Sequence, residues 1–142
     1  MSQEMLTVKL CELDEKIGKM RSRIYMSGFA QHDRIRNQIR DLRQECEETD
    51  LEIRKSLEYS RAEAVGAISE AYAEIGRSIR KAKRKLQESA EKGEEAAAEE
   101  KILLAEYMLD FAMQAANSAL LSSLEAMDAQ MTSEEKEEKE TL

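Results

Sequence analysis

The sequence predicts an all-α protein in which long helices pair as an antiparallel hairpin or coiled coil and close a helical bundle by self-association. Helix breakers are rare, because proline is absent and glycine occurs only five times in 142 residues. Apolar residues recur at spacings of three and four, the pattern of helices that bury one face. With 37% charged, 42% hydrophobic and 4% aromatic residues, the composition is typical of long paired helices. We expect three helices in a single domain, residues 1–131.

The first predicted helix spans residues 4–26 and carries a heptad seam. The periodicity fails at Ser27 and Gly28, and it resumes at Ile35 with its register moved by one residue. We favour a turn, in which Gly28 adopts the left-handed conformation and Asp33 supplies an N-cap or first-turn carboxylate. The alternative is one continuous helix through Gly28 with an inserted residue. The seam consists of Leu6, Leu10, Leu13, Ile17, Met20 and Ile24.

The second predicted helix spans residues 30–92. Between about residues 57 and 73 its apolar stripe becomes small, with Ser60, Ala64, Ala67 and Ala71, so a neighbouring backbone could approach closely there. Larger residues then return at spacings of three and four and form a second seam. This seam consists of Val65, Ile68, Tyr72, Ile75, Ile79, Ala82 and Leu86.

The third predicted helix spans residues 95–131 and follows the best turn signal in the chain, Lys92–Gly93–Glu94. Its apolar residues lie on more than one face, so it needs at least two neighbouring helices. The hairpin supplies one, and we expect a homo-oligomer, with a dimer favoured, or another helical protein to supply the rest. Residues 132–142 are expected to form a disordered acidic tail. The expected interface residues are Leu104, Met108, Phe111, Met113, Leu120 and Leu124.

Charge divides the sequence into two unlike parts. Residues 1–93 carry 19 Lys and Arg against 17 Asp and Glu, a balance of +2, and residues 94–142 carry 3 against 13, a balance of −10. The formal net charge of −8 disfavours general nucleic-acid binding. One segment without acids is a candidate anion-binding site, although we favour a basic surface that an acidic helix partly neutralises. Its residues are Arg77, Arg80, Lys81, Lys83, Arg84 and Lys85.

Site chemistry is sparse, so we expect no enzymatic activity, no cofactor and no metal. The single histidine, His32, is expected to cap a helix or lie on the surface. Cys11 and Cys46 are expected to be partly buried free thiols in a cytoplasmic protein. A membrane span over residues 102–124 is disfavoured because acids interrupt it. The sequence therefore predicts a structural or adaptor protein that acts through protein–protein association, with binding to an anionic surface, nucleic acid or lipid head groups, as the alternative.

Overall fold

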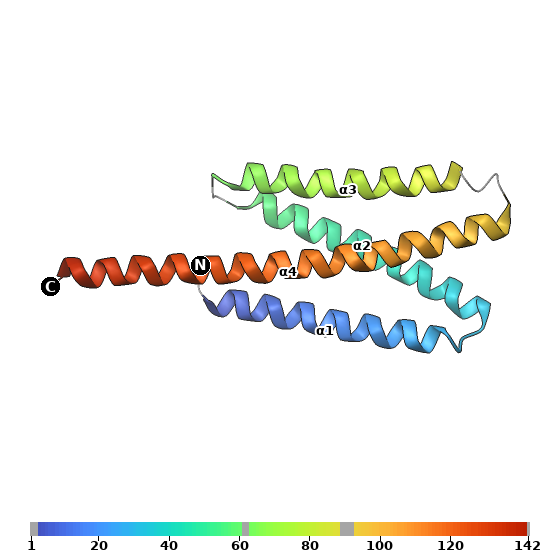
Figure 1. The fold of residues 1–142 in the computed structure, drawn as a ribbon, viewed down its shortest axis with the longest axis horizontal. Coiled ribbons are helices and arrows are strands. Elements are labelled where there is room, and N and C mark those ends of the chain that lie inside the picture. Colours follow the sequence, from blue (N-terminus) through green and yellow to red (C-terminus); the bar gives the residue numbers. More distant parts are fainter. Residues whose placement is uncertain (1–2, 61–62, 89–92, 142) are drawn as a thin grey trace. The chain divides into compact units, whose positions relative to one another are not determined.

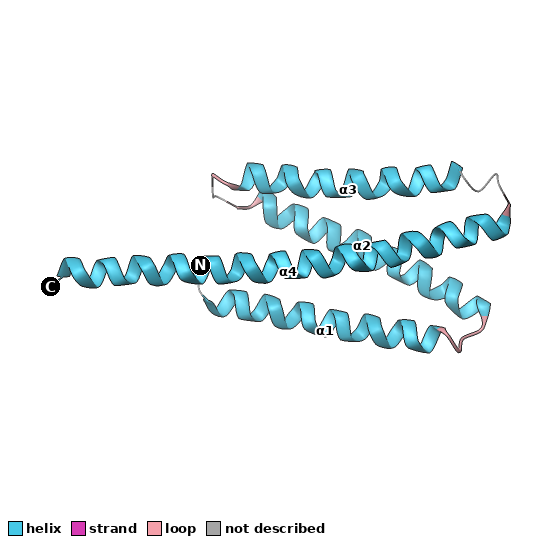
Figure 2. Cartoon of the chain, in the orientation of Figure 1, coloured by secondary structure: helices cyan, strands magenta, loops and turns pink. Residues whose placement is uncertain are grey.

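The computed structural model describes residues 3–60, 63–88 and 93–141. Within these ranges the chain forms four α-helices and no strand (Figures 1 and 2). The all-α class is therefore confirmed, whereas the expected number of three helices is wrong. The helices are α1 (Gln3–Ser27), α2 (His32–Glu58), α3 (Val65–Glu88) and α4 (Glu94–Thr141). The chain divides into two compact units, one of Lys16–Glu88 and one of Met1–Glu15 with Ser89–Leu142.

A turn at residues 28–31 separates α1 from α2, so the alternative of a continuous helix through Gly28 is wrong. The amide of Phe29 donates to the carbonyl three residues earlier (3.2 Å), which closes α1 with a tight last turn. Among the described glycines, only Gly93 has a positive φ, so Gly28 does not adopt the expected left-handed conformation. Asp33 lies in the first turn of α2, where a carboxylate interacts favourably with the helix dipole.

The second predicted helix is interrupted, so its expected span of residues 30–92 is wrong. α2 ends at Glu58 and α3 begins at Val65. At Ser60 the amide hydrogen bond spans three residues rather than four (3.3 Å). The apolar stripe consists of small side chains here, so a straight helix would bury little, whereas a turn lets α3 pack back on α2. The far end of the predicted helix, residues 89–92, lies outside the described residues.

Side-chain contacts link the three helical segments of the Lys16–Glu88 unit. Glu45 of α2 accepts hydrogen bonds from Lys16 (3.0 Å) and Arg23 (3.1 Å from each of two guanidinium nitrogens), both on α1. Another part of α2 packs against α3. Some residues of the predicted second seam are half-buried in α3, and so are small residues that lie between them. The half-buried residues of α3 are Val65, Ser69, Tyr72, Gly76, Ala82 and Leu86.

The turn before α4 forms at Gly93, as expected. Gly93 has φ +115° and its carbonyl accepts the amide hydrogen of Ala97 (3.0 Å). Glu94 and Glu95 occupy the first turn of α4, where their charges complement the helix dipole. Lys92 lies outside the described residues.

The C-terminal segment is helical through Thr141, which corrects the expectation that residues 132–142 are disordered; Leu142 lies outside the described residues. The segment contains no glycine or proline, and glutamate and lysine are good helix formers. Gln130 donates to Glu134 one turn later (3.3 Å), and the hydroxyl of Thr132 donates to the carbonyl of Asp128 (2.9 Å). This segment therefore forms a helix although it has no apolar stripe with which to pack against another helix.

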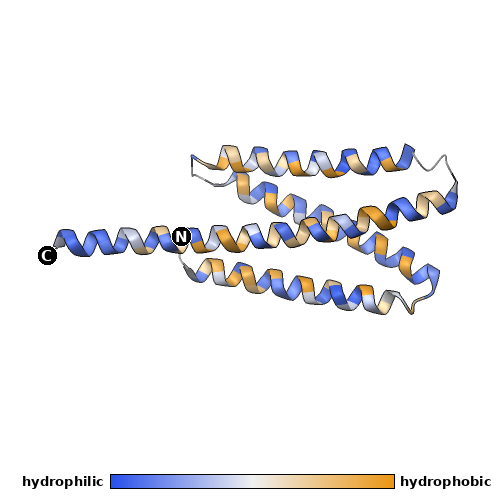
Figure 3. Cartoon of the chain, in the orientation of Figure 1, coloured by the Kyte–Doolittle hydropathy of each residue, from blue (hydrophilic) through white to orange (hydrophobic). Residues whose placement is uncertain are grey.

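Apolar side chains are distributed along the helices without a closed core. None of the residues in the described ranges, Gln3 and Ser27 left aside, is buried, and many large apolar side chains are exposed. Figure 3 shows apolar residues along each helix, whereas the last turns of α4 are hydrophilic. No helix in the described part of the chain combines the length and the hydrophobicity that a membrane crossing requires. The single chain thus leaves apolar surface in contact with water.

Candidate functional site

The six expected interface residues fall on two faces of α4. At about 100° per residue, Leu104, Met108 and Phe111 lie within one arc. Met113, Leu120 and Leu124 lie within another arc, about 180° from the first. Leu104 and Met108 are half-buried, whereas Phe111 is 64% exposed and Met113 is 66% exposed. The structure therefore separates the expected interface into two opposite surfaces.

The second of these surfaces continues along α4 as a narrow stripe, which we call the α4 seam. Its six residues are spaced by seven, four, seven, four and seven, so the pattern repeats every eleven residues. They fall within about 60° of one another around the helix. Each is about half exposed or more, from 49% at Leu120 to 66% at Met113. The α4 seam consists of Ile102, Leu109, Met113, Leu120, Leu124 and Met131.

The two flanks of the α4 seam differ in charge. Asp110 and Asp128 follow one flank, and Glu106 lies at the edge of the α4 seam on the same side. The other flank contains no acid between Ile102 and Met131 and consists mainly of small residues. Its members are Ala105, Ala112, Ala116, Ala119, Ser123 and Gln130, with Met127 at the edge of the α4 seam on this side. Because of this asymmetry, a second helix that packs on the α4 seam meets different charges in a parallel and in an antiparallel orientation.

The basic segment of α3 also divides between faces. By helical spacing, Arg77, Arg80, Lys81 and Arg84 share one face, whereas Lys83 and Lys85 lie at its two margins. We call the four residues that share a face the basic face. The expected cluster of six cations is thus a face of four, with one further lysine at each margin.

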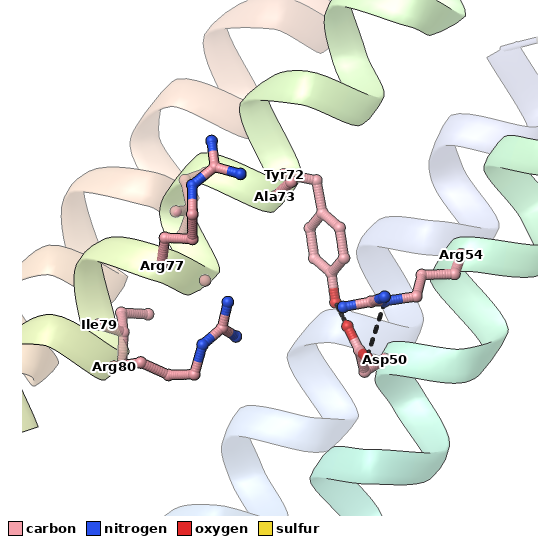
Figure 4. A pocket seen from close by; sticks show the side chains of 9 residues that line it. Asp50, Arg54, Tyr72, Ala73, Arg77, Ile79 and Arg80 are labelled. Atoms are coloured by element: carbon pink, nitrogen blue, oxygen red, sulfur yellow. Dashed lines mark hydrogen bonds and ion pairs between the residues drawn. The ribbon is translucent and has the colours of Figure 1, made fainter.

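Two residues of the basic face line a hollow of about 420 Å³ between α2 and α3, which we call the arginine hollow. Figure 4 shows Arg77 and Arg80 extending from α3 on one side of the hollow, with Arg54 of α2 across from them. Asp50 and Tyr72 form the wall beside Arg54. The hollow therefore has three guanidinium groups around one carboxylate.

The carboxylate of Asp50 is already engaged by two neighbours. The hydroxyl of Tyr72 donates to its Oδ1 (2.6 Å), and Nε of Arg54 lies 2.9 Å from its Oδ2 (Figure 4). The hydrogen bond from Tyr72, followed by that from Arg54, lowers the pKa of Asp50 from its ordinary value of 3.8. The same hydrogen bond raises the pKa of Tyr72 above 10.0. Asp50 is thus a charged anchor that orients Tyr72 and Arg54.

Sequence reasoning identified Arg77 and Arg80 but not Asp50, Arg54 or Tyr72 as site residues. Asp50 and Arg54 are visible as a pair four residues apart on one helix, a common surface arrangement. Their link to Tyr72 depends on the turn between α2 and α3, which sequence reasoning also missed. Tyr72 was interpreted as a member of an apolar seam, although its hydroxyl requires a polar partner when it is partly buried.

The remaining candidate residues form no reactive cluster in the described ranges. Cys11 and Cys46 are free thiols, and both are exposed, so the expectation that they are partly buried is wrong. His32 begins α2 and is exposed, while Gln31 occupies the N-cap position without a side-chain hydrogen bond. Among the described residues, no group of three or more His, Cys, Asp or Glu side chains is placed to hold a metal ion.

The chain was compared with models of known families, with curated proteins and with solved structures, and it matches none of them. Its function is therefore inferred from the arrangement of the described side chains.

Proposed function

We propose that this protein is a non-enzymatic architectural or adaptor protein, in which two copies pair through the α4 seam as a coiled coil and close a helical bundle. The observation that carries the proposal is the exposed eleven-residue repeat of α4. Such a repeat, at 3.67 residues per turn, keeps an apolar stripe on one side of a long helix and favours a nearly straight or slightly right-handed pairing. Self-association is the simplest way to cover a stripe that every copy presents.

The size of the seam is consistent with a reversible dimer. Covering a half-exposed large apolar side chain contributes about 1 kcal/mol. Twelve such side chains, six from each copy, contribute about 12 kcal/mol, against an association cost of about 4–15 kcal/mol. Because the two quantities are similar, we expect pairing to depend on protein concentration.

The flank charges favour a parallel orientation. In a parallel pair each acidic flank faces the other copy's uncharged flank, whereas in an antiparallel pair the two acidic flanks face each other. An antiparallel pair would bring Glu106 of one copy close to the other copy's Asp128. Like charges in this position destabilise a pair by a few tenths of a kcal/mol each at low salt. Parallel pairing avoids this repulsion.

Light scattering coupled to size exclusion tests the proposal, with circular dichroism on the same samples. Leu120→Glu places a charge in the α4 seam of each copy and is expected to produce a helical monomer. Phe111→Glu is the matched control, because Phe111 is also exposed but lies on the opposite face of α4, and it is expected to leave the dimer intact. A monomeric wild-type protein, or dissociation by the control alone, would contradict the proposal and would direct the search towards a different helical partner.

The proposal places the protein in a reducing cytoplasm, where two exposed free thiols persist. It requires no cofactor or metal.

A second candidate function is binding of the basic face to an anionic surface, either nucleic acid or lipid head groups. It is supported by four cations on one face of α3, and the net charge of −8 opposes it. It predicts salt-sensitive binding that weakens when Lys81, Lys83, Arg84 and Lys85 are replaced by Gln, because this variant removes two cations of the basic face and both lysines at its margins. Unchanged binding in that variant would remove this candidate.

A further inference from the structure

We propose that the arginine hollow binds the phosphate monoester group of a small ligand, held mainly by Arg77 and Arg80. This inference is independent of pairing through the α4 seam, because the hollow lies entirely within the Lys16–Glu88 unit.

The charge of the hollow matches a dianion. Arg54, Arg77 and Arg80 supply three positive charges and Asp50 supplies one negative charge, which leaves a local balance of +2. A phosphate monoester carries about −1.5 to −2 at neutral pH. A carboxylate or a phosphodiester, with a single negative charge, would neutralise only half of this balance.

The guanidinium groups differ in how far they are already engaged. Arg54 is paired with Asp50 at 2.9 Å, and Asp50 is further engaged by Tyr72. Within the described ranges, Arg77 and Arg80 form no hydrogen bond or ion pair, and the charge of Arg80 acts on Asp50 only as a weaker contribution to its lowered pKa. Planar guanidinium groups recognise phosphate through two parallel N–H donors, so two such groups on one side of a hollow are suited to this ligand.

Gly76 allows Arg80 to lie close to its own helix. A Cβ atom at position 76 would lie 3.2 Å from Nη1 of Arg80, which is closer than most contacts of this kind. The glycine thus leaves room for the guanidinium to fold back along α3, with its nitrogens at the edge of the hollow (Figure 4). A methyl group at this position would make the guanidinium shift by a few tenths of an ångström without changing any charge.

The hollow also has space and apolar wall for an organic group. Its volume of about 420 Å³ exceeds that of a phosphate group alone, and Ile75 and Ile79 line it beside the ring of Tyr72. Ile75 is 60% exposed, so a ligand that covers it would gain apolar contact. A small phosphorylated compound with an apolar or aromatic part fits this combination better than inorganic phosphate does.

The proposal is tested by isothermal titration calorimetry of the full chain at low salt, which measures its affinity for phenyl phosphate, inorganic phosphate and benzoate. Phenyl phosphate is expected to bind most tightly. The double variant Arg77→Gln, Arg80→Gln is expected to weaken its binding at least about tenfold, since two charge-assisted contacts are lost. The matched control Lys81→Gln, Arg84→Gln removes the same charge from the same helix outside the hollow and is expected to change the affinity less than about threefold.

Gly76→Ala gives a second test that leaves the net charge unchanged. It is expected to weaken phenyl phosphate binding, by less than the Arg77→Gln, Arg80→Gln variant does, while the helix remains at least as stable because alanine is the better helix former. Equal losses in the two double variants would mean that only net charge matters and would overturn the proposal. Absence of saturable binding at millimolar phenyl phosphate would overturn it too, as would binding to vesicles that contain phosphatidic acid without any binding of the soluble compound.

Discussion

The hydroxyl of Tyr72 donates a 2.6 Å hydrogen bond to Oδ1 of Asp50, and this bond joins α3 to α2 across a separation of 22 residues. It is a specific polar contact in a unit where no described residue is buried. The bond also orders one wall of the arginine hollow. We therefore expect it to matter both for the pairing of the two helices and for ligand binding.

Replacement of Tyr72 by Phe keeps the ring and removes the hydrogen-bond donor. We expect the midpoint of thermal unfolding to fall by about 2–4 °C, since a single partly buried hydrogen bond contributes about 1 kcal/mol to stability. Circular dichroism on heating measures this shift. Tyr107→Phe is the control, because Tyr107 is exposed and contacts the ring of Phe111, which the substitution preserves. Equal midpoints for the two variants would show that the Tyr72 hydroxyl does not contribute.

The free energy of unfolding should decrease at low pH because Glu45 becomes protonated. The hydrogen bonds from Arg23 and Lys16 lower the pKa of Glu45 from 4.5 to about 2 in the folded protein. A lowered folded-state pKa means that the contribution of Glu45 is fully present above pH 4.5 and is lost as the pH falls towards 2. Glu45→Gln should therefore reduce the pH dependence of the free energy of unfolding, measured in urea between pH 4.5 and about pH 2. A variant with the wild-type pH dependence there would contradict the role of the Glu45 contacts.

Two glycines at helix ends should respond differently to alanine. Gly93 has φ +115°, where an L side chain is strained, and Gly93→Ala is expected to lower the free energy of unfolding by about 1–2 kcal/mol. A Cβ atom at Gly28 would meet only the carbonyl oxygen of Tyr25, at an ordinary 3.5 Å. Gly28→Ala should therefore be neutral or slightly stabilising. Denaturant unfolding of both variants measures the difference, and the reverse order would contradict the two backbone conformations.

Sequence patterns predicted the parts of the fold that depend on local signals. Glycine marked the turns at Gly28 and Gly93, and apolar spacing indicated that the intervening segments are helical. The turn after Glu58 has no glycine or proline, so periodicity alone could not locate it. The helical C-terminal segment was missed because it has no apolar stripe. Its residues nevertheless have high helix propensity, which is sufficient for a helix there.

The candidate sites were predictable to different degrees. The six cations of α3 were visible as a run, and helical geometry divides them into the basic face and one lysine at each of its margins. The arginine hollow depends on how α2 and α3 pack, so its residues from α2 could not be assigned from sequence. The eleven-residue repeat of α4 is present in the sequence, but the expected interface residues were chosen from two opposite faces of the helix and do not follow it.

Distances between spin labels on two copies test the central claim most directly. In a background with Cys11→Ser and Cys46→Ser, single labels are placed at Lys101→Cys or Gln130→Cys, near the two ends of the α4 seam. Parallel pairing predicts a short intermolecular distance, below about 25 Å, at both positions, since packed helix axes are about 8–10 Å apart. Antiparallel pairing would give about 44 Å at both, from 29 residues at 1.5 Å. That longer distance would contradict the parallel orientation, and the absence of any intermolecular distance would contradict self-association through α4.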